Sequence, residues 1–238
     1  MKRSLFGIAA IAAMIGTPAL AADMMPYKAP PPATPVWGWT GFYIGGDAGV
    51  AWATDTVSPL VADGGTFPRS NKLSTTGVLG GATAGFNYQF SSFLLGIEGD
   101  IGAMEIGGSK ADPLGGTEVD NLNNGLYGDV TGRLGFVWGS ALLYGKGGWA
   151  LYNGQGSTTT GLPGFTVTQT GTFSGWTYGG GLEYRLGGPW SAKVEYLHFA
   201  FGTKDAALTS AAGVFPYANV LSADTVKFGL NYQFGGPR

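Results

Sequence analysis

Apolar and polar residues alternate with a period of two along most of the chain beyond residue 40. Such alternation is typical of a β-strand, whose successive side chains point to opposite faces. It recurs in eight segments of 10 to 14 residues. A tilted strand needs about nine to eleven residues to cross a bilayer, whereas strands of soluble proteins usually have about five or six. The predicted strands are Gly41–Ala53, Gly77–Phe90, Phe93–Ala103, Leu126–Trp138, Ala141–Leu151, Gly175–Leu186, Trp190–Ala200 and Thr225–Phe234.

Short and long connections alternate between these strands. Three are tight turns, at Ser91–Ser92, Gly139–Ser140 and Gly187–Pro189, which places both termini at the short-turn side, as in outer-membrane barrels. A closed barrel satisfies every backbone hydrogen-bonding group in lipid, whereas an open sheet does not. We therefore predict an all-β fold, an eight-stranded antiparallel up-and-down transmembrane β-barrel with short periplasmic turns and four long extracellular loops. The long loops are residues 54–76, 104–125, 152–174 and 201–224.

Every charged residue within the eight segments lies on the face opposite the aromatic and aliphatic side chains. A charge on the lipid-facing side would cost about 2–4 kcal/mol at mid-membrane, so the charged face is expected to line the lumen. The set has six acids and five bases, which suits mutual pairing, and Arg133 is the expected hub because one guanidinium can bridge two carboxylates. The eleven residues are Asp47, Glu98, Asp100, Asp129, Arg133, Lys146, Glu183, Arg185, Lys193, Glu195 and Lys227.

Aromatic residues gather at both ends of the predicted strands. A water-soluble, lipocalin-like barrel would show the same alternation with its charges facing outward. Two aromatic belts favour the membrane barrel instead, because Trp and Tyr are enriched at the two membrane interfaces. The residues expected to form these girdles are Trp52, Phe90, Phe93, Trp138, Trp149, Trp176, Trp190 and Tyr196.

Composition narrows the class of protein further. Asp, Glu, Lys and Arg make up only 12% of the chain, 44% is apolar, and 44 of the 238 residues are Gly. This composition excludes extensive disorder and suits a surface that faces a solvent other than water. The net charge of −2 and the lack of a Lys/Arg cluster exclude nucleic-acid binding. Because the chain has no Cys, it can form neither a disulfide nor a thiolate metal site.

The beginning of the chain has the three parts of a secretory signal peptide. Lys2 and Arg3 precede an apolar run from Leu5 to Ile15, and small residues at 19 and 21 mark a cleavage site. No later segment is long and apolar enough for a transmembrane helix, which needs about 18 residues. We therefore divide the chain into a signal peptide (residues 1–21), a Pro-rich periplasmic spacer (22–38), the outer-membrane β-barrel (39–234) and a C-terminal tail (235–238).

Short stretches spread over nearly the whole mature chain resemble one family. The sequences are WTGFYIGG (39–46), LGIEGD (95–100), GRLG (132–135), VEY (194–196) and VKFGLNYQF (226–234). They are similar to the small alphaproteobacterial outer-membrane immunogenic proteins of the porin family, which belong to the outer-membrane β-barrel proteins. The resemblance implies an eight-stranded barrel in the cell outer membrane with a periplasmic N-terminus.

The resemblance also implies how the protein reaches its membrane. In the wider class, alternating apolar and aromatic residues of the last strand, ending in Phe, are the signal for the barrel-assembly machinery, which is the expected partner. Four residues follow Phe234 here, so the terminal position of that Phe is not kept. The expected assembly signal comprises Val226, Phe228, Leu230, Tyr232 and Phe234.

The expected function is structural and surface-exposed, in support of envelope integrity and surface interaction. A lumen of eight strands is just wide enough for side chains to fill, so paired charges predict a closed or very narrow lumen. The alternative is a narrow pore for ions or small solutes. The expected contacts of the protein are outer-membrane lipid and lipopolysaccharide, and Asp55, Asp63, Asp112 and Asp120 in the long loops could touch divalent cations that bridge lipopolysaccharide.

Enzymatic activity and cofactor binding have weaker support. A lipid-modifying enzyme or surface protease would need a base and a nucleophile near the outer rim, and His198, the only His, could act there with Ser174 or Asp205. No triad spacing supports such a site. The loops offer no His or Met pair for haem iron. We therefore expect no catalytic, cofactor or metal site.

Overall fold

The structure is a computed structural model that describes residues 38–59, 71–111, 119–154, 156–159, 166–169, 172–210 and 213–235. The predicted signal peptide, all of the spacer except Gly38, and the last three residues of the tail lie outside these ranges. Among the described residues, no helix has the length and hydropathy needed to cross a bilayer.

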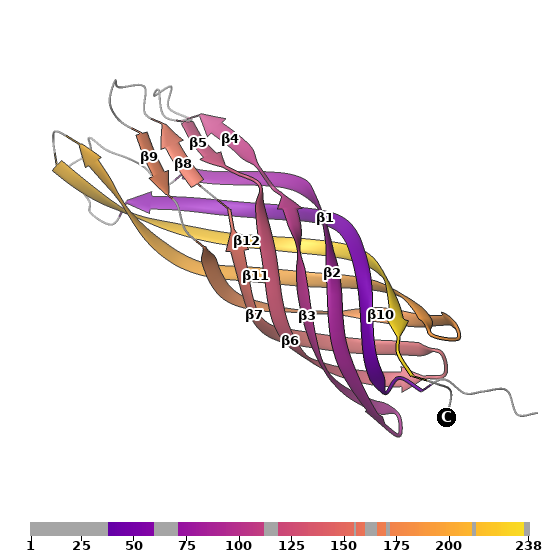
Figure 1. The fold of residues 1–238 in the computed structure, drawn as a ribbon. Coiled ribbons are helices and arrows are strands. Elements are labelled where there is room, and N and C mark those ends of the chain that lie inside the picture. Colours follow the sequence, from indigo (N-terminus) through magenta and orange to yellow (C-terminus); the bar gives the residue numbers. More distant parts are fainter. Residues whose placement is uncertain are drawn as a thin grey trace, which may run out of the picture. The chain divides into compact units, whose positions relative to one another are not determined.

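Eight long strands close into one barrel (Figure 1). Each pairs with its two neighbours in antiparallel fashion, and β12 closes the barrel on β1, with Gln233 opposite Tyr43. The eight-stranded antiparallel barrel predicted from the alternation is confirmed. Its strands, in their order around the barrel, are β1 (Gly41–Pro59), β12 (Gly213–Gln233), β11 (Trp190–Ser210), β10 (Phe173–Gly187), β7 (Ala141–Asn153), β6 (Gly125–Trp138), β3 (Phe93–Glu105) and β2 (Asn71–Phe90).

Three two-residue turns lie at one end of the barrel, which we call the turn end; the other is the loop end. The turns are Ser91–Ser92, Gly139–Ser140 and Gly188–Pro189. The first residue of each turn has a φ of 55° to 59°. Gly139 and Gly188 enter this region without steric cost, and Ser91 is the non-Gly residue among the three. The described C-terminal residue, Gly235, follows β12 at this same end (Figure 1).

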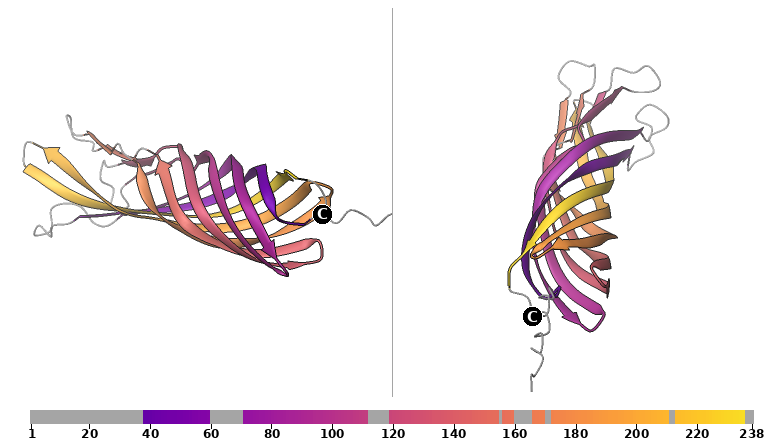
Figure 2. Two further views of the ribbon diagram at one scale, coloured as in Figure 1. Left: turned by 60° about the horizontal axis from the view of Figure 1, so that its bottom comes forward. Right: turned by 90° about the vertical axis from the view of Figure 1, so that its right-hand side faces the viewer.

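The predicted boundaries at the loop end are wrong in several places. β1 and β2 continue to Pro59 and from Asn71, and β11 and β12 remain paired as far as Ser210 and Gly213. The expected loop at 201–224 is therefore a hairpin that projects beyond the barrel (Figure 2). Lipid enforces an apolar outer face only within the membrane, so paired strands beyond it need no strict alternation. A register shift between Ala200 and Thr203 further breaks the pattern, at a Gly202 with a φ of 64°.

Two other expected loops also contain strands. β4 (Gly108–Ala111) and β5 (Val119–Leu122) interrupt the connection from β3 to β6, and β8 (Gly156–Thr159) and β9 (Thr166–Gln169) interrupt that from β7 to β10. They pair in the order β4-β5-β8-β9 into a small antiparallel sheet at the loop end (Figures 1 and 2). The described parts of these two connections therefore include regular strands that the alternation did not predict.

The two faces of the barrel wall differ sharply in chemistry. Inward-facing Glu98 and Lys227 are almost fully buried, whereas outward-facing Phe42, Ile101 and Phe228 are about two-thirds exposed. A water-soluble barrel would show the reverse distribution, since burying charges and exposing large apolar side chains to water are both costly. The distribution therefore favours the membrane barrel over the lipocalin-like alternative.

Candidate functional site

Arg133 of β6 lies at the centre of the lumen, where it contacts two carboxylates. Its Nη2 donates to Glu183 of β10, and its Nη1 lies 3.4 Å from an oxygen of Glu98 on β3. Lys146 of β7 lies beside the same Glu98 at 2.6 Å and reaches Asp100 at 3.0 Å. Strand pairing sets these distances. Arg133 is opposite Lys146 on β7 and opposite Gly96 on β3, and Glu98 follows Gly96 by two residues.

Lys227 of β12 forms a second centre on the opposite wall. Its Nζ lies 3.2 Å from Glu195, 3.4 Å from Asp100 and 3.7 Å from Asp47. Lys146 also contacts Glu195, at 3.1 Å, so Asp100 and Glu195 join the two centres into one network. Such buried ion pairs do not necessarily stabilise a protein, but removal of one partner leaves an uncompensated charge.

Neutral side chains complete the network, and these partners were not predicted. The Tyr43 hydroxyl donates to Glu98 at 2.6 Å, and that of Tyr144 donates to Glu195 at 2.8 Å. Ser191 and Asn231 donate to the same oxygen of Glu183, at 2.5 and 2.8 Å. Tyr43 and Tyr144 lie on the charged face of their strands, which is the one sequence signal that could have identified them.

Two of the eleven predicted charges do not pair as expected. Arg185 lies near the turn end, where its guanidinium donates to the carbonyls of Gly38 and Gly188 and to Gln233, and covers the ring of Trp39. Asp129 is buried, yet neither of its oxygens has a hydrogen-bond or ion-pair partner among the described residues. Apart from Arg185, the buried charged side chains that were predicted to face the lumen are six carboxylates and four cations, an excess of two negative charges.

This imbalance leads to a prediction for Asp129. Replacing Asp129 with Asn keeps the shape of the side chain and removes a buried, unpaired charge. We expect Asp129→Asn to leave the free energy of unfolding within about 1 kcal/mol of wild type, or to raise it. Denaturant unfolding in lipid vesicles, followed by tryptophan fluorescence, measures this. A loss of several kcal/mol would show that Asp129 is an essential partner of the network.

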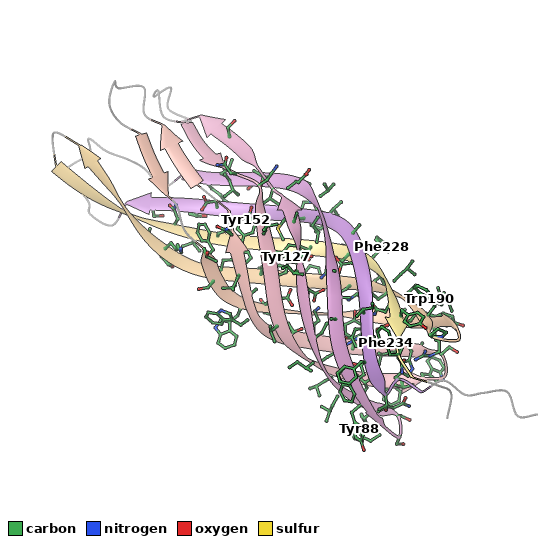
Figure 3. The ribbon with its side chains drawn as sticks, viewed as in Figure 1. Tyr88, Tyr127, Tyr152, Trp190, Phe228 and Phe234 are labelled. Atoms are coloured by element: carbon green, nitrogen blue, oxygen red, sulfur yellow. The ribbon has the colours of Figure 1, made fainter. Side chains whose placement is uncertain are left out.

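Apolar side chains lie on both sides of the charged layer. At the turn end, Trp39, Leu94, Leu142 and Tyr144 form a small buried cluster. Toward the loop end, Phe199 of β11 packs edge-on against Tyr127 of β6 across the lumen and stacks with Phe201 on its own strand (Figure 3 labels Tyr127). This larger cluster comprises Ala51, Ala53, Leu73, Leu79, Met104, Ile106, Leu122, Tyr127, Ala150, Tyr152, Phe173, Leu197, Phe199, Phe201, Leu221 and Ala223.

Glycines on neighbouring strands make room for the inward-facing tyrosines. A Cβ at Gly85 would lie 2.4 Å from the Tyr43 hydroxyl and 2.6 Å from the carbonyl oxygen of Ile97. Overpacking of this kind costs about 1–3 kcal/mol, so we expect Gly85→Ala to lower the free energy of unfolding by that amount. Gly46→Ala is the matched control, because its Cβ would meet nothing nearer than 3.6 Å. Equal unfolding midpoints for the two variants would contradict the prediction.

All eight predicted girdle residues are exposed on the outside of the barrel. Near the turn end, Phe90 and Phe93 stack, and Trp190 packs edge-on against Tyr232. Figure 3 shows Tyr88, Trp190 and Phe234 at this end. Trp149 of β7 and Trp176 of β10 pack edge-on against each other, nearer to the loop end. Contact of these residues with the membrane interfaces stays a prediction.

The predicted assembly signal forms the outward face of β12 and the residue that follows it. The backbone N–H of Phe234 donates to the carbonyl of Phe42, which extends the pairing of β12 with β1 by one residue. The signal role itself stays a prediction. Its residues are Val226, Phe228, Leu230, Tyr232 and Phe234.

Of the candidate catalytic residues, His198 and Ser174 have described side chains, and these two are not hydrogen-bonded to each other. His198 is hydrogen-bonded to Asp224, which was not predicted, and has no hydrogen bond with Ser174 among the described residues. The Asp205 side chain lies outside the described part of the structure. No cluster of three or more His, Cys, Asp or Glu suited to a metal ion occurs in the described ranges, which exclude Asp63, Asp112 and the side chain of Asp120. Asp55 faces the lumen and is buried.

Comparisons with known proteins agree with this architecture. Residues 8–234 match the family described as "Outer membrane protein beta-barrel domain". The 31 kDa outer-membrane immunogenic protein of Brucella melitensis is 32% identical over 95% of this chain and 98% of its own length. A 22 kDa outer membrane protein of Rhizobium leguminosarum bv. viciae is 27% identical, over 85% of this chain and 82% of its own.

The similarity of this chain to solved structures is weaker than its similarity to these sequence relatives. The outer membrane protein OprG from Pseudomonas aeruginosa matches 84% of this chain and 100% of its own, with 12% identity and a TM-score of 0.48. Functional comparison therefore depends on the sequence relatives.

Proposed function

The chain belongs to the outer-membrane protein β-barrel domain family, and from this premise we propose that it is a structural, surface-exposed barrel with a closed lumen. The observation that carries the proposal is the layering of the lumen. A network of buried ion pairs, with Arg133 at its centre, lies between apolar side chains on both sides. An ion entering from either end would have to displace packed apolar groups before reaching the ion-pair network.

The narrow pore is the competing function for the same lumen. An eight-stranded barrel encloses a space that side chains can fill, and the inward-facing ring of Phe199 on β11 contacts that of Tyr127 on β6 across it and that of Phe201 on its own strand. A conducting lumen usually presents a continuous polar lining. The apolar cluster toward the loop end interrupts such a lining, which supports the closed form.

We also propose that the protein is not an enzyme. Its relatives carry the names of outer-membrane and immunogenic proteins. A hydrolase of the acyl-transfer type would need a nucleophile within hydrogen-bond reach of His198. Among the described residues, the hydrogen-bond partner of the His198 ring is Asp224, a carboxylate placed to orient a base rather than to serve as the nucleophile of acyl transfer.

The orientation follows from the lengths of the connections. We propose that the turn end faces the periplasm and that the projecting strands of the loop end face outward, as is usual for outer-membrane barrels. The surface-exposed hairpin of β11 and β12 and the small sheet of β4, β5, β8 and β9 would then meet lipopolysaccharide and external partners. Assembly would use the outward face of β12 as its signal.

Deletion of the gene in its native bacterium tests the structural role. We expect the deletion strain to become more sensitive to detergent and to EDTA, and expression of the wild-type protein to restore resistance. Expression of the Arg185→Gln variant, which changes a charge outside the ion-pair network, should restore resistance as well and serves as the control for complementation. Unchanged sensitivity together with impaired uptake of a small solute would contradict the structural role and favour the pore.

A further inference from the structure

A short segment just before β1 lies inside the turn end of the barrel. This segment, residues 38–40, which we call the strap, is outside the antiparallel strand pairing, which begins at Gly41. The Trp39 side chain is only 3% exposed and belongs to the small apolar cluster that includes Leu94 and Leu142. One ring of the apolar layer at the turn end therefore comes from a residue that is not part of the barrel wall.

Polar side chains of both strands that neighbour β1 hold the strap. On one side, Gln233 of β12 donates through its Nε2 to the carbonyls of Gly38 and Thr40, at 3.0 and 2.9 Å. On the other side, Oε1 of Gln89 on β2 accepts from the backbone N–H of Trp39 at 2.9 Å, and the backbone N–H of Gln89 donates to the Thr40 hydroxyl at 2.9 Å. Each of these hydrogen bonds involves a side chain, so the strap is attached to the wall without extending its backbone ladder.

Arg185 holds the strap from a third strand, β10. Its Nη2 donates to the carbonyl of Gly38 at 3.1 Å and to Oε1 of Gln233 at 2.8 Å, so it also orients the amide that binds the strap. Its guanidinium lies over the Trp39 ring, 4.4 Å from the centroid. In the described part of the structure, these contacts and one to the carbonyl of Gly188 take the place of the carboxylates that the other inward-facing cations contact.

We propose that the strap is a separable plug of the turn end of the lumen. Its release would break hydrogen bonds to three strands and uncover the apolar cluster, while the strand pairing of the wall stays intact. Local opening of this kind costs less free energy than unfolding of the whole domain. The opened lumen would be accessible from the turn end alone, because the ring cluster around Phe199 still closes it toward the loop end. The proposal rests on the closed lumen proposed above and adds that the strap controls access to the ion-pair network from the turn end.

Labelling of single cysteines tests the proposal directly, because the chain itself has no Cys. Leu142→Cys places a thiol in the turn-end cluster, and Leu197→Cys places one in the larger cluster toward the loop end; both positions are completely buried. The folded protein in detergent micelles is treated with iodoacetamide, and intact-mass spectrometry follows the rate of labelling. With the wild-type strap, we expect both thiols to react far more slowly than in the unfolded chain.

Gln233→Leu should raise the labelling rate of Leu142→Cys about tenfold and leave that of Leu197→Cys unchanged. The substitution removes two hydrogen bonds to the strap but keeps the Trp39 ring, and the rate follows the population of the opened state. Trp39→Ala should raise the rate at least as much, and it serves as the test if Gln233→Leu does not fold. Asp129→Asn, which changes an inward-facing side chain outside the strap contacts, is the control and should leave the rate unchanged. Heat-modifiable migration on an SDS gel verifies that each variant is folded.

Three outcomes would overturn the proposal. An unchanged labelling rate of Leu142→Cys in Gln233→Leu, or in Trp39→Ala where that variant serves as the test, would refute the separable plug and leave the closed lumen standing. An equal rise at Leu197→Cys would show that the whole barrel loosens and that the strap is not a separate unit. Labelling of Leu142→Cys at the rate of the unfolded chain, with the strap intact, would contradict the closed lumen itself.

Discussion

Replacing Arg133 with Met should destabilise the barrel by about 3–5 kcal/mol. Arg133 is fully buried and contacts Glu98 and Glu183. Its removal raises the excess of carboxylates in the network from two to three and leaves Glu183 without a cationic partner among the described residues. Because a Met side chain fills most of the same volume, the loss would reflect the uncompensated charge rather than a cavity. The measurement is the free energy of unfolding in denaturant, with the protein in lipid vesicles.

Arg185→Met is the matched control for this prediction. It removes a guanidinium that is only half-buried and whose hydrogen bonds end on backbone carbonyls and the amide of Gln233. We expect a loss of about 1–2 kcal/mol, smaller than that of Arg133→Met. The double variant Arg133→Met with Glu183→Gln should regain part of the loss. Equal effects of the two Arg substitutions would contradict a special role of Arg133 in the network.

Replacing Phe199 with Ala should cost about 3–5 kcal/mol. Phe199 is completely buried at the centre of the apolar cluster toward the loop end, where its ring contacts those of Tyr127 and Phe201. Truncation would leave a cavity that the surrounding strands cannot close, because backbone pairing on both sides holds them apart. The unfolding experiment used for Arg133 measures this loss as well.

The contrast with an outward-facing ring makes the result interpretable. Phe228 on β12 is two-thirds exposed on the barrel surface, so lipid chains can fill the space that truncation leaves. We expect Phe228→Ala to cost clearly less than Phe199→Ala. A smaller loss for Phe199→Ala than for Phe228→Ala would show that the ring cluster is loosely packed and does not obstruct the lumen.

Alternation predicted the barrel because lipid imposes a simple rule on one face of each strand. Within the membrane, outward-facing positions such as Ile101 and Phe228 must be apolar. Apolar residues therefore recur along each strand with a period of two. Beyond the membrane that rule ends. The predicted strands therefore stop near Ala53 and Ala200, although backbone pairing continues to Pro59 and Ser210.

The contacts inside the lumen could be predicted only in part. The parity of each strand identifies which charges face inward, but the pairing of Arg133 with Glu183, 50 residues away, depends on the register of several strands. Register is set by turn geometry and packing, which one sequence does not reveal. On β11 the inward positions change from Glu195 to Leu197 and Phe199, so the inward face also becomes apolar there and charged residues no longer mark the lumen side.

Single-channel recording of the folded protein in planar bilayers tests the central claim of a closed lumen most directly. We expect no steady conductance from the wild type under either polarity of the applied voltage, with heat-modifiable migration showing that the inserted protein is folded. A steady conductance in the wild type that shifts in Arg133→Ala would place an ion path through the charged network and contradict the closed lumen.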